Sequence, residues 1–379
     1  MKNRTNLIFL HKLIKAFADS FVCAFVPLII LKNSGSLMLT MFYLVSYGLI
    51  TAVLNIVLKK FLQRHGVIGI ILHSIPIIAF QFLLTLEITW WVCLLVAFLA
   101  AVAQALYSVP LNLLFSFTDK EVNVAKFQIP TNIGKLVFII LSGYVIGSSL
   151  NNSVLVLAIV GTVLYIASSI PLIYGYKLIK ESYDKIANNP PVVDKKSYHA
   201  FNLFHIAFSV FQSVLDYILP LYLYMENLAF ESVAIVMALI ELCKIGSNMF
   251  ANFLVKKNRE VLSVVISSIC MIVGVIVIMI VKVPVVLYVC SCVIAVSFPL
   301  LFVPMFAAYV KKLTKDNNQF DGMTSRDIYI MFAKEILFLP YLVVPSFLGQ
   351  FVIGIGAAAL ISVCATKILV DKKNKNSLL

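Results

Sequence analysis

Carboxylate and amine side chains stand inside long apolar runs of this sequence, where charged groups are unusual. Asp216 lies in "QSVLDYILPLYL", four residues before Pro220. A proline ring clashes with the carbonyl four residues earlier and removes a backbone hydrogen bond, so the chain should be loosened at the acid itself. A carboxylate in such a place could bind a solute or carry a proton, as intramembrane acids do. We therefore treat Asp216 as a candidate substrate or ion site.

The segment around Asp216 has a counterpart near the N-terminus, "DSFVCAFVPLII". A kinked segment that recurs half a chain later indicates a parallel repeat of two helical bundles, as in many transporters. The repeat adds Asp19, Cys23 and Gln212 to the candidate substrate and ion residues. The matched positions are Asp19 with Gln212, Ser20 with Ser213, Cys23 with Asp216 and Pro27 with Pro220.

Two further groups of intramembrane charges have helical spacing that permits pairing. Glu241 and Lys244 are three residues apart, and Lys15 and Asp19 are four apart. Residues at these spacings share one helix face, so each pair can form a local ion pair instead of a binding site. Lys12 could extend to the membrane surface along its apolar stem.

Lys135, Lys334 and Glu335 complete the set of intramembrane charges. Lys334 and Glu335 are adjacent and therefore point about 100° apart on a helix. We expect one of them to face a cavity and the other to face helix packing. Lys15, Lys135 or Lys334 could bind an anion, and Lys135 or Lys334 could instead be the structural partner of Asp216.

The elements that must position these groups are membrane-spanning helices. The chain is 61% hydrophobic and 12% charged, with a mean hydropathy of +1.01, against about 45–50% and 25% in soluble domains. Runs such as "VLSVVISSICMIVGVIVIMIV" are apolar throughout, whereas the strands of a membrane barrel alternate between apolar and polar residues. The fold class predicted is an all-α membrane protein embedded in the lipid bilayer.

Twelve spans of about 20 residues can be placed along the 379 residues. A polar interval with a Pro-Pro break divides them into six and six. The predicted organisation is a six-helix bundle over residues 1–176, a central loop over 177–200, which could begin with a short amphipathic helix, and a second six-helix bundle over 201–379. The spans are expected at 6–31, 37–58, 67–86, 90–115, 128–149, 153–176, 201–225, 229–254, 261–281, 284–310, 328–349 and 351–370.

The loops differ sharply in basic residues. Alternate loops and both termini carry most of the Lys and Arg, including Arg326 before the eleventh span, whereas the other loops hold only Lys32 and Lys282. Such an asymmetry predicts a multi-pass cell-membrane protein with both termini in the cytoplasm. It also explains the net charge of +13 without a nucleic-acid partner. The seven cysteines lie in apolar runs without metal-ligand spacing, so no cofactor, metal site or disulfide is expected.

Six plus six spans with a basic turn between the second and third resemble the major facilitator superfamily. The turn reads "KKFLQRHGV", in which Arg64 and Gly66 match the Arg-x-Gly of the family's cytoplasmic gating loop. Gln63 stands where the family has Asp, so the acidic half of that gate is absent. The resemblance implies that the first, fourth, seventh and tenth spans line a central cavity. In the fourth span this adds Gln104 and Tyr107 to the candidates.

Other motifs of the family are missing. The fifth span, "LSGYVIGSS", lacks the drug-antiporter signature, and the fourth span has no Arg. The six-plus-six resemblance still implies a secondary transporter that moves a small organic solute by alternating access, with protons as a candidate coupling ion. The alternatives are efflux of amphipathic compounds, lipid translocation, or a transporter-like sensor or partner subunit. A membrane enzyme is not expected, because no polar loop carries a His/acid pair at catalytic spacing.

Overall fold

A computed structural model describes residues 2–117, 124–148, 152–188, 198–257, 259–281 and 283–376. Throughout these residues the regular elements are helices, and no strand occurs among them. The first half contains α1 (Lys2–Phe21), η1 (Cys23–Phe25), α2 (Val26–Ser34), α3 (Leu37–Val57), α4 (Lys59–Leu72), α5 (Ser74–Leu83), α6 (Trp90–Phe117), α7 (Val124–Gly147), α8 (Ser153–Tyr174) and α9 (Tyr176–Ala187). The second half contains α10 (His199–Ser213), η3 (Val214–Ile218), α11 (Leu219–Met225), α12 (Phe230–Lys256), α13 (Glu260–Ile280), α14 (Pro284–Lys315), α15 (Gln319–Val343) and α16 (Phe347–Asn376).

The helices correspond to the twelve predicted spans. In the described chain, eight single helices are long and apolar enough to cross a membrane, and two bent pairs, α1 with α2 and α4 with α5, bring the total to ten. The remaining two predicted spans are α7, of which residues 132–147 form the described apolar part, and α15, which carries several charges. Helices suit this environment because each backbone group bonds within its own segment.

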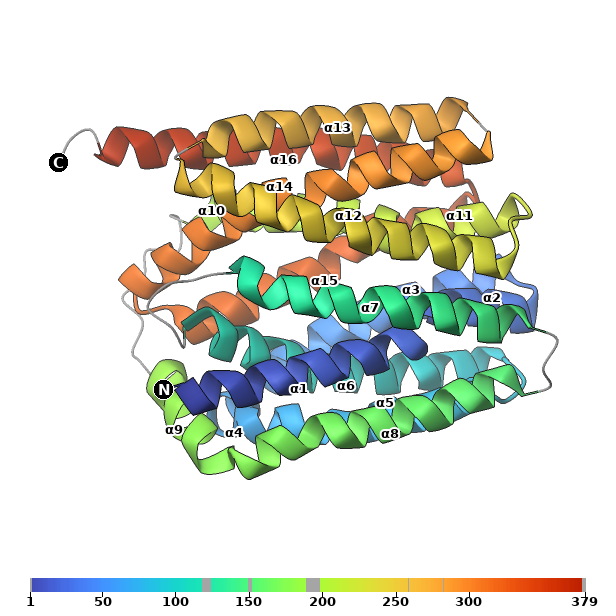
Figure 1. Cartoon of the computed structure of the whole chain (residues 1–379), viewed down its shortest axis with the longest axis horizontal. Coiled ribbons are helices and arrows are strands. Elements are labelled where there is room, and N and C mark those ends of the chain that lie inside the picture. The colour runs from blue at the N-terminus through green and yellow to red at the C-terminus, as the bar shows by residue number, and fades with distance from the viewer. Residues whose placement is uncertain are drawn as a thin grey trace.

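The two halves of the chain form two layers of helices that meet along α7 and α12 and along α3 and α15 (Figure 1). Within the first half α1 packs on α7 and α8, and α6 packs on α3, α4 and α5. Within the second half α10 packs on α15 and α16, and α14 packs on α12 and α13. In each half, the first span packs on the fifth and sixth, and the fourth packs on the second and third. This repeated pattern fits the predicted six-plus-six arrangement.

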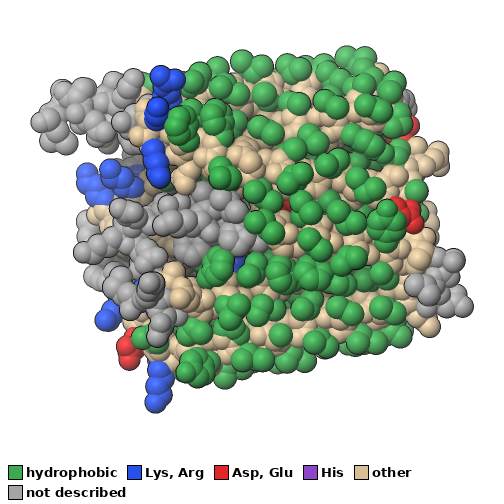
Figure 2. All heavy atoms as spheres, viewed as in Figure 1, with side chains coloured by type: hydrophobic (Ala, Val, Ile, Leu, Met, Phe, Trp, Pro, Cys, Tyr) green, Lys and Arg blue, Asp and Glu red, His purple; other side chains and the backbone are tan. Residues whose placement is uncertain are grey.

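The two ends of the molecule differ in charge. Helix α1 begins and α16 ends at the same end, beside α9 (Figure 1). Figure 2 shows Lys and Arg side chains at this end and a broad hydrophobic surface along the helices. We call the end where α1 begins and α16 ends the basic end. Lys32, predicted in an opposite loop, lies in the last turn of α2, where its Nζ donates to the carbonyl of Ile146 at 2.5 Å.

The central interval contains a helix, as the sequence allowed. Helix α9 is amphipathic and buries Ile179, Tyr183 and Ala187. The Tyr183 hydroxyl donates to the carbonyl of Leu62 at 2.6 Å, which fixes α9 against α4. Burial raises the pKa of this phenol, so it remains a donor. The Pro-Pro break at Pro190 and Pro191 lies outside the described residues.

The eleventh span begins earlier than predicted. The sequence interpretation started it at residue 328 and assigned Arg326 to a loop, but α15 starts at Gln319. Arg326 and Asp327 are buried at 8% and 4% exposure and form an ion pair of 3.1 Å. The prediction was wrong because a buried pair of opposite charges can continue a span that hydropathy alone would end.

Candidate functional site

A cavity of about 670 Å³ lies between the two halves of the chain. It is lined from both halves, by side chains of α1, α3, α5, α6 and α7 and of α10, η3, α12, α14 and α15. Most residues singled out from the sequence lie on its wall: Lys15, Asp19, Cys23, Gln104, Tyr107, Lys135, Gln212, Asp216, Glu241, Lys244 and Lys334. Glu335, Arg64 and Gly66 do not line it.

The first helix is broken where it reaches this cavity. Val22 has φ −122° and ψ −49°, a 3₁₀ turn follows at Cys23–Phe25, and the two arms of the span are bent by 41°. The break precedes Pro27, which lacks the amide hydrogen that would continue the helix. The result is that Asp19 and Cys23 lie on either side of the break.

The seventh helix is distorted at the equivalent place. A π-turn at Val214–Ile218 interrupts it just before Pro220. A π-turn adds one residue to the turn and releases backbone groups, and such turns are frequent at functional sites. Asp216 lies in the middle of this turn and lines the cavity. The local distortion predicted from the two prolines is therefore present in both halves.

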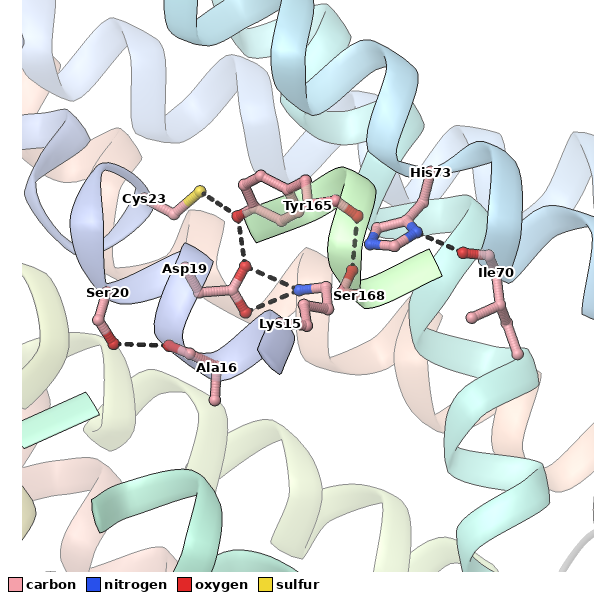
Figure 3. A network of polar contacts seen from close by, with 9 residues as sticks. All are labelled: Lys15, Ala16, Asp19, Ser20, Cys23, Ile70, His73, Tyr165 and Ser168. Atoms are coloured by element: carbon pink, nitrogen blue, oxygen red, sulfur yellow. Dashed lines mark hydrogen bonds and ion pairs between the residues drawn. The ribbon is translucent and has the colours of Figure 1, made fainter. Parts of the chain in front are cut away.

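Asp19 is the centre of a polar network in the first half (Figure 3). The ammonium of Lys15 donates to its two oxygens at 2.8 and 2.7 Å, and the hydroxyl of Tyr165 donates to Oδ1 at 2.5 Å. The Sγ of Cys23 lies 3.1 Å from the same hydroxyl. The local pair expected from the spacing of Lys15 and Asp19 is confirmed. Tyr165, from α8, was not predicted.

Two histidines extend this network behind Tyr107. The His73 ring centroid lies 4.4 Å from that of Tyr107, and the His11 centroid lies 5.7 Å from it. His11 Nδ1 is 2.7 Å from the carbonyl of Ser168, and the Lys15 ammonium lies 4.1 Å above the Tyr107 ring. Sequence reasoning missed both histidines. The available signal was that His11 precedes Lys15 by four residues and shares its face.

Asp216 has a cationic partner on another helix. Its Oδ1 lies 3.4 Å from the ammonium of Lys244 in α12, which also lies 3.0 Å from Glu241. Gln212 donates to Oδ2 at 3.0 Å. The local Glu241–Lys244 pair is confirmed. The suggestion that Lys135 or Lys334 would be the partner of Asp216 is wrong, because the packing of α12 on this side of the cavity could not be read from one helix.

Three lysines line the cavity without an ion pair to any described carboxylate: Lys12, Lys135 and Lys334. Lys12 lies 4.4 Å above the ring of Phe115, and Lys334 lies 5.4 Å from the rings of both Tyr47 and Tyr217. Lys12 also lies within electrostatic range of Lys15 and Lys135. Lys12 thus lines the cavity, although its apolar stem could also have let it extend to the membrane surface. These groups give the cavity wall an excess of positive charge.

Lys334 and Glu335 diverge as expected of neighbours on a helix. Lys334 faces the cavity, and Glu335 is buried at 5% exposure in the packing of α15 on α3. A Cβ atom added at Gly48 of α3 would overlap Glu335 Oε1. The carboxyl group of Glu335 therefore occupies the space that the missing side chain of Gly48 leaves between the two helices.

The gating-loop residues lie at the basic end, away from the cavity. Arg64 and Gly66 are in α4, where His65 has non-helical angles of φ −128° and ψ 25°. Gly66 packs against the Tyr183 ring, and an added Cβ would overlap it. Lys59, the first residue of α4, forms an ion pair of 2.9 Å with Asp321 of α15. This pair joins the two halves of the chain at the basic end.

Metal-ligating groups do not cluster in the described part of the chain. No set of three or more His, Cys, Asp or Glu side chains there could hold a metal ion. The seven cysteines, all described, are free thiols. The chemistry available at the cavity is that of ammonium, guanidinium, carboxylate, phenol, amide, imidazole, thiol and hydroxyl groups.

Comparisons with known proteins agree with this architecture. A bacterial homologue of the iron transporter ferroportin, in an outward-facing state with soaked iron, has a TM-score of 0.71 at 15% identity, covering 96% of this chain and 98% of its own. The nucleoside transporter NupG has a TM-score of 0.64 at 12% identity, covering 97% and 99%. A POT family transporter in complex with a thioalcohol-conjugated peptide gives 0.64 at 12% identity, covering 97% and 96%. At these identities the likeness concerns the fold.

No curated protein sequence matches the chain significantly. The family profile described as Major Facilitator Superfamily matches residues 8–320, which is most of the sequence. This match, over the helices that pack in two halves around a shared cavity, shows that the chain belongs to the Major Facilitator Superfamily of membrane transporters.

Proposed function

We propose that this protein is a secondary transporter that moves a small organic anion across the cell membrane by alternating access. The cavity supports a solute site between two bundles, because both halves of the chain contribute to its wall. Its volume of about 670 Å³ falls within the usual range for small-molecule sites, about 300–1,000 Å³. The broken first helix and the π-turn in the seventh resemble the irregular spans that form transporter sites.

We choose an anion because the side chains that line the cavity have an excess of positive charge. Asp19, Asp216 and Glu241 each have an ammonium within 3.4 Å. Lys12, Lys135 and Lys334 have no such counter-charge among the described residues. Unpaired cations in a membrane interior are costly, and an anionic solute that bound there would lower that cost by charge-assisted hydrogen bonds.

The basic end is proposed to face the cytoplasm. The start of α1, the end of α16 and the Lys and Arg side chains visible on the surface lie there (Figures 1 and 2). The positive-inside rule expects such basic residues on the cytoplasmic side. At the opposite end α2 packs on α11, and the rings of Phe25 and Phe230 lie 6.1 Å apart. In this conformation the two halves are thus in contact beyond the broken helices.

Uptake by proteoliposomes tests the proposal. Purified protein is reconstituted and offered labelled anionic, cationic and zwitterionic solutes, with counterflow as the readout. Lys334→Met should raise the half-saturating concentration of the transported anion about tenfold or more, since a hydrogen bond to a charged group is worth about 1.5–3 kcal/mol. Lys177→Met removes an exposed lysine of α9 and is the matched control.

Two outcomes would contradict this function. Uptake of a cation that does not respond to Lys334→Met would show that the lysines do not select the solute. Absence of counterflow for the whole panel, with protein that remains folded, would favour the transporter-like sensor or partner subunit.

A further inference from the structure

Glu335 is a buried carboxylate that does not line the cavity. It is 5% exposed, and neither of its oxygens has a hydrogen-bond partner among the described residues. It lies in α15 where this helix packs on α3. Because α3 and α15 belong to opposite halves of the chain, Glu335 is buried in the contact between the two bundles.

Four other carboxylates inside the described spans lie beside cations. Lys15 lies 2.7 Å from Asp19, Lys244 lies 3.4 Å from Asp216 and 3.0 Å from Glu241, and Arg326 lies 3.1 Å from Asp327. Glu335 has no ion pair of this kind in the described chain. It therefore differs from these four carboxylates in how its charge could be balanced.

The charged group nearest to Glu335 is Lys334, and it points elsewhere. Its ammonium lies 5.4 Å from the ring centroids of Tyr47 and Tyr217 and forms no ion pair with Glu335. Tyr47 on α3 is the neighbouring phenol. The helices α6, α10 and α16, which also pack on α15, bring no charged group of the described chain to Glu335.

An ionised carboxylate in such a place would be strongly unfavourable, and buried groups of this kind hold a proton instead. Gly48 leaves just enough room for the carboxyl group, and the carbonyl of Met331 approaches the same point. Separation of α3 from α15 would admit water to Glu335. Its O–H bond could then break, the proton passing to water and the electron pair remaining on the carboxylate.

We propose that Glu335 is the proton-carrying group of this transporter, protonated while α3 and α15 are packed and ionised when they separate. The proposal rests on the alternating-access function proposed above. One proton would be taken up and released per cycle, so closure of the bundle contact would be linked to protonation. Asp216, which the sequence favours for this role, has a counter-charge in Lys244 at 3.4 Å.

Infrared spectroscopy of purified protein in lipid nanodiscs tests the protonation directly. At neutral pH the wild type should show the carbonyl stretch of a protonated carboxyl group, and Glu335→Gln should lose it. Asp216→Asn is the matched control and should keep the band, because the Asp216 carboxyl group has an ion-pair partner in Lys244 and lies outside the contact of α3 with α15. A band that is missing from the wild type, or unchanged in Glu335→Gln, would overturn the proposal.

A distance measurement tests the link to bundle separation. Spin labels replace the exposed residues Met38 on α3 and Val343 on α15 in a cysteine-free background. As the pH rises through the titration of Glu335, the separated population should increase up to about tenfold per pH unit, and Glu335→Gln should abolish this dependence. Separation that ignores pH in the wild type would overturn the proposal.

Both measurements are made without solute. They therefore distinguish a failure of this inference from a failure of the proposed transport function, which the counterflow assay alone decides.

Discussion

The ammonium of Lys244 in α12 bridges two carboxylates, 3.4 Å from Asp216 in the π-turn of the seventh span and 3.0 Å from Glu241 on its own helix. Lys244→Met would remove the cation and leave both acids uncompensated. Breaking a buried pair in this way costs about 3–5 kcal/mol, and the partial exposure of Asp216 should reduce that to about 2–3 kcal/mol. We expect a lower melting temperature in detergent. The triple variant Lys244→Met, Asp216→Asn, Glu241→Gln should recover most of the loss, and failure of that rescue would show that the three charges do not act as a unit.

Asp216→Asn separates solute binding from coupling. Lys244 keeps Glu241 as a partner in this variant, so we expect a folded protein. If Asp216 contributes to the solute site, gradient-driven accumulation and solute exchange should fall together in proteoliposomes. Loss of accumulation with intact exchange would instead identify Asp216 as the coupling acid.

The ion pair of Lys59 and Asp321 connects the two halves at the basic end. Both side chains are more than 40% exposed, so the pair should add little to stability, about 0–1 kcal/mol. Lys59→Glu should nevertheless change the rate of exchange, because like charges would then face each other across the bundle contact. Addition of Asp321→Lys should restore the wild-type rate. A reversed pair that behaves like the single variant would exclude this role.

Gly66 permits the close contact between α4 and α9. Gly66→Ala would place a Cβ atom against the Tyr183 ring, and overpacking of this kind costs about 1–3 kcal/mol. Gly246→Ala is the control, because nothing lies within 4 Å of its added Cβ in α12 and alanine favours a helix by about 0.5–1 kcal/mol. Thermal unfolding should show a lower midpoint for the first variant and an equal or higher one for the second. Equal midpoints would contradict this packing argument.

The orientation of the chain can be tested by chemical labelling of single cysteines in a cysteine-free background. Substitutions at Lys185 in α9 and at Lys315 at the end of α14 should be accessible from the cytoplasm, and at Glu226 from outside. The expected division follows from the basic end. Labelling of Lys185→Cys from outside would reject the proposed topology. Asn151, another position predicted outside, lies beyond the described residues.

Much of the fold could be predicted from local sequence, because the bilayer demands long apolar segments and satisfied backbone groups. Pro27 predicted the break in the first helix and Pro220 the π-turn in the seventh, since the effect of proline on its own helix is local. The Lys15–Asp19 and Glu241–Lys244 pairs followed from helical spacing. The boundary of α15 did not follow, because hydropathy ignores the pairing of Arg326 with Asp327.

The sequence by itself determined the class of the protein, its spans, the asymmetry of its charged loops and the candidate residues of the cavity wall. Only the tertiary structure decided which charges are balanced by groups on other helices. Asp216 has its cation on a different helix, and Tyr165 reaches Asp19 from α8. Glu335, adjacent to a lysine in the sequence, lies where α3 meets α15 and has no hydrogen-bond partner in the part of the chain that the structure describes. The reason is physical: electrostatic balance depends on distances of a few ångströms between helices, and one sequence does not specify how those helices face each other.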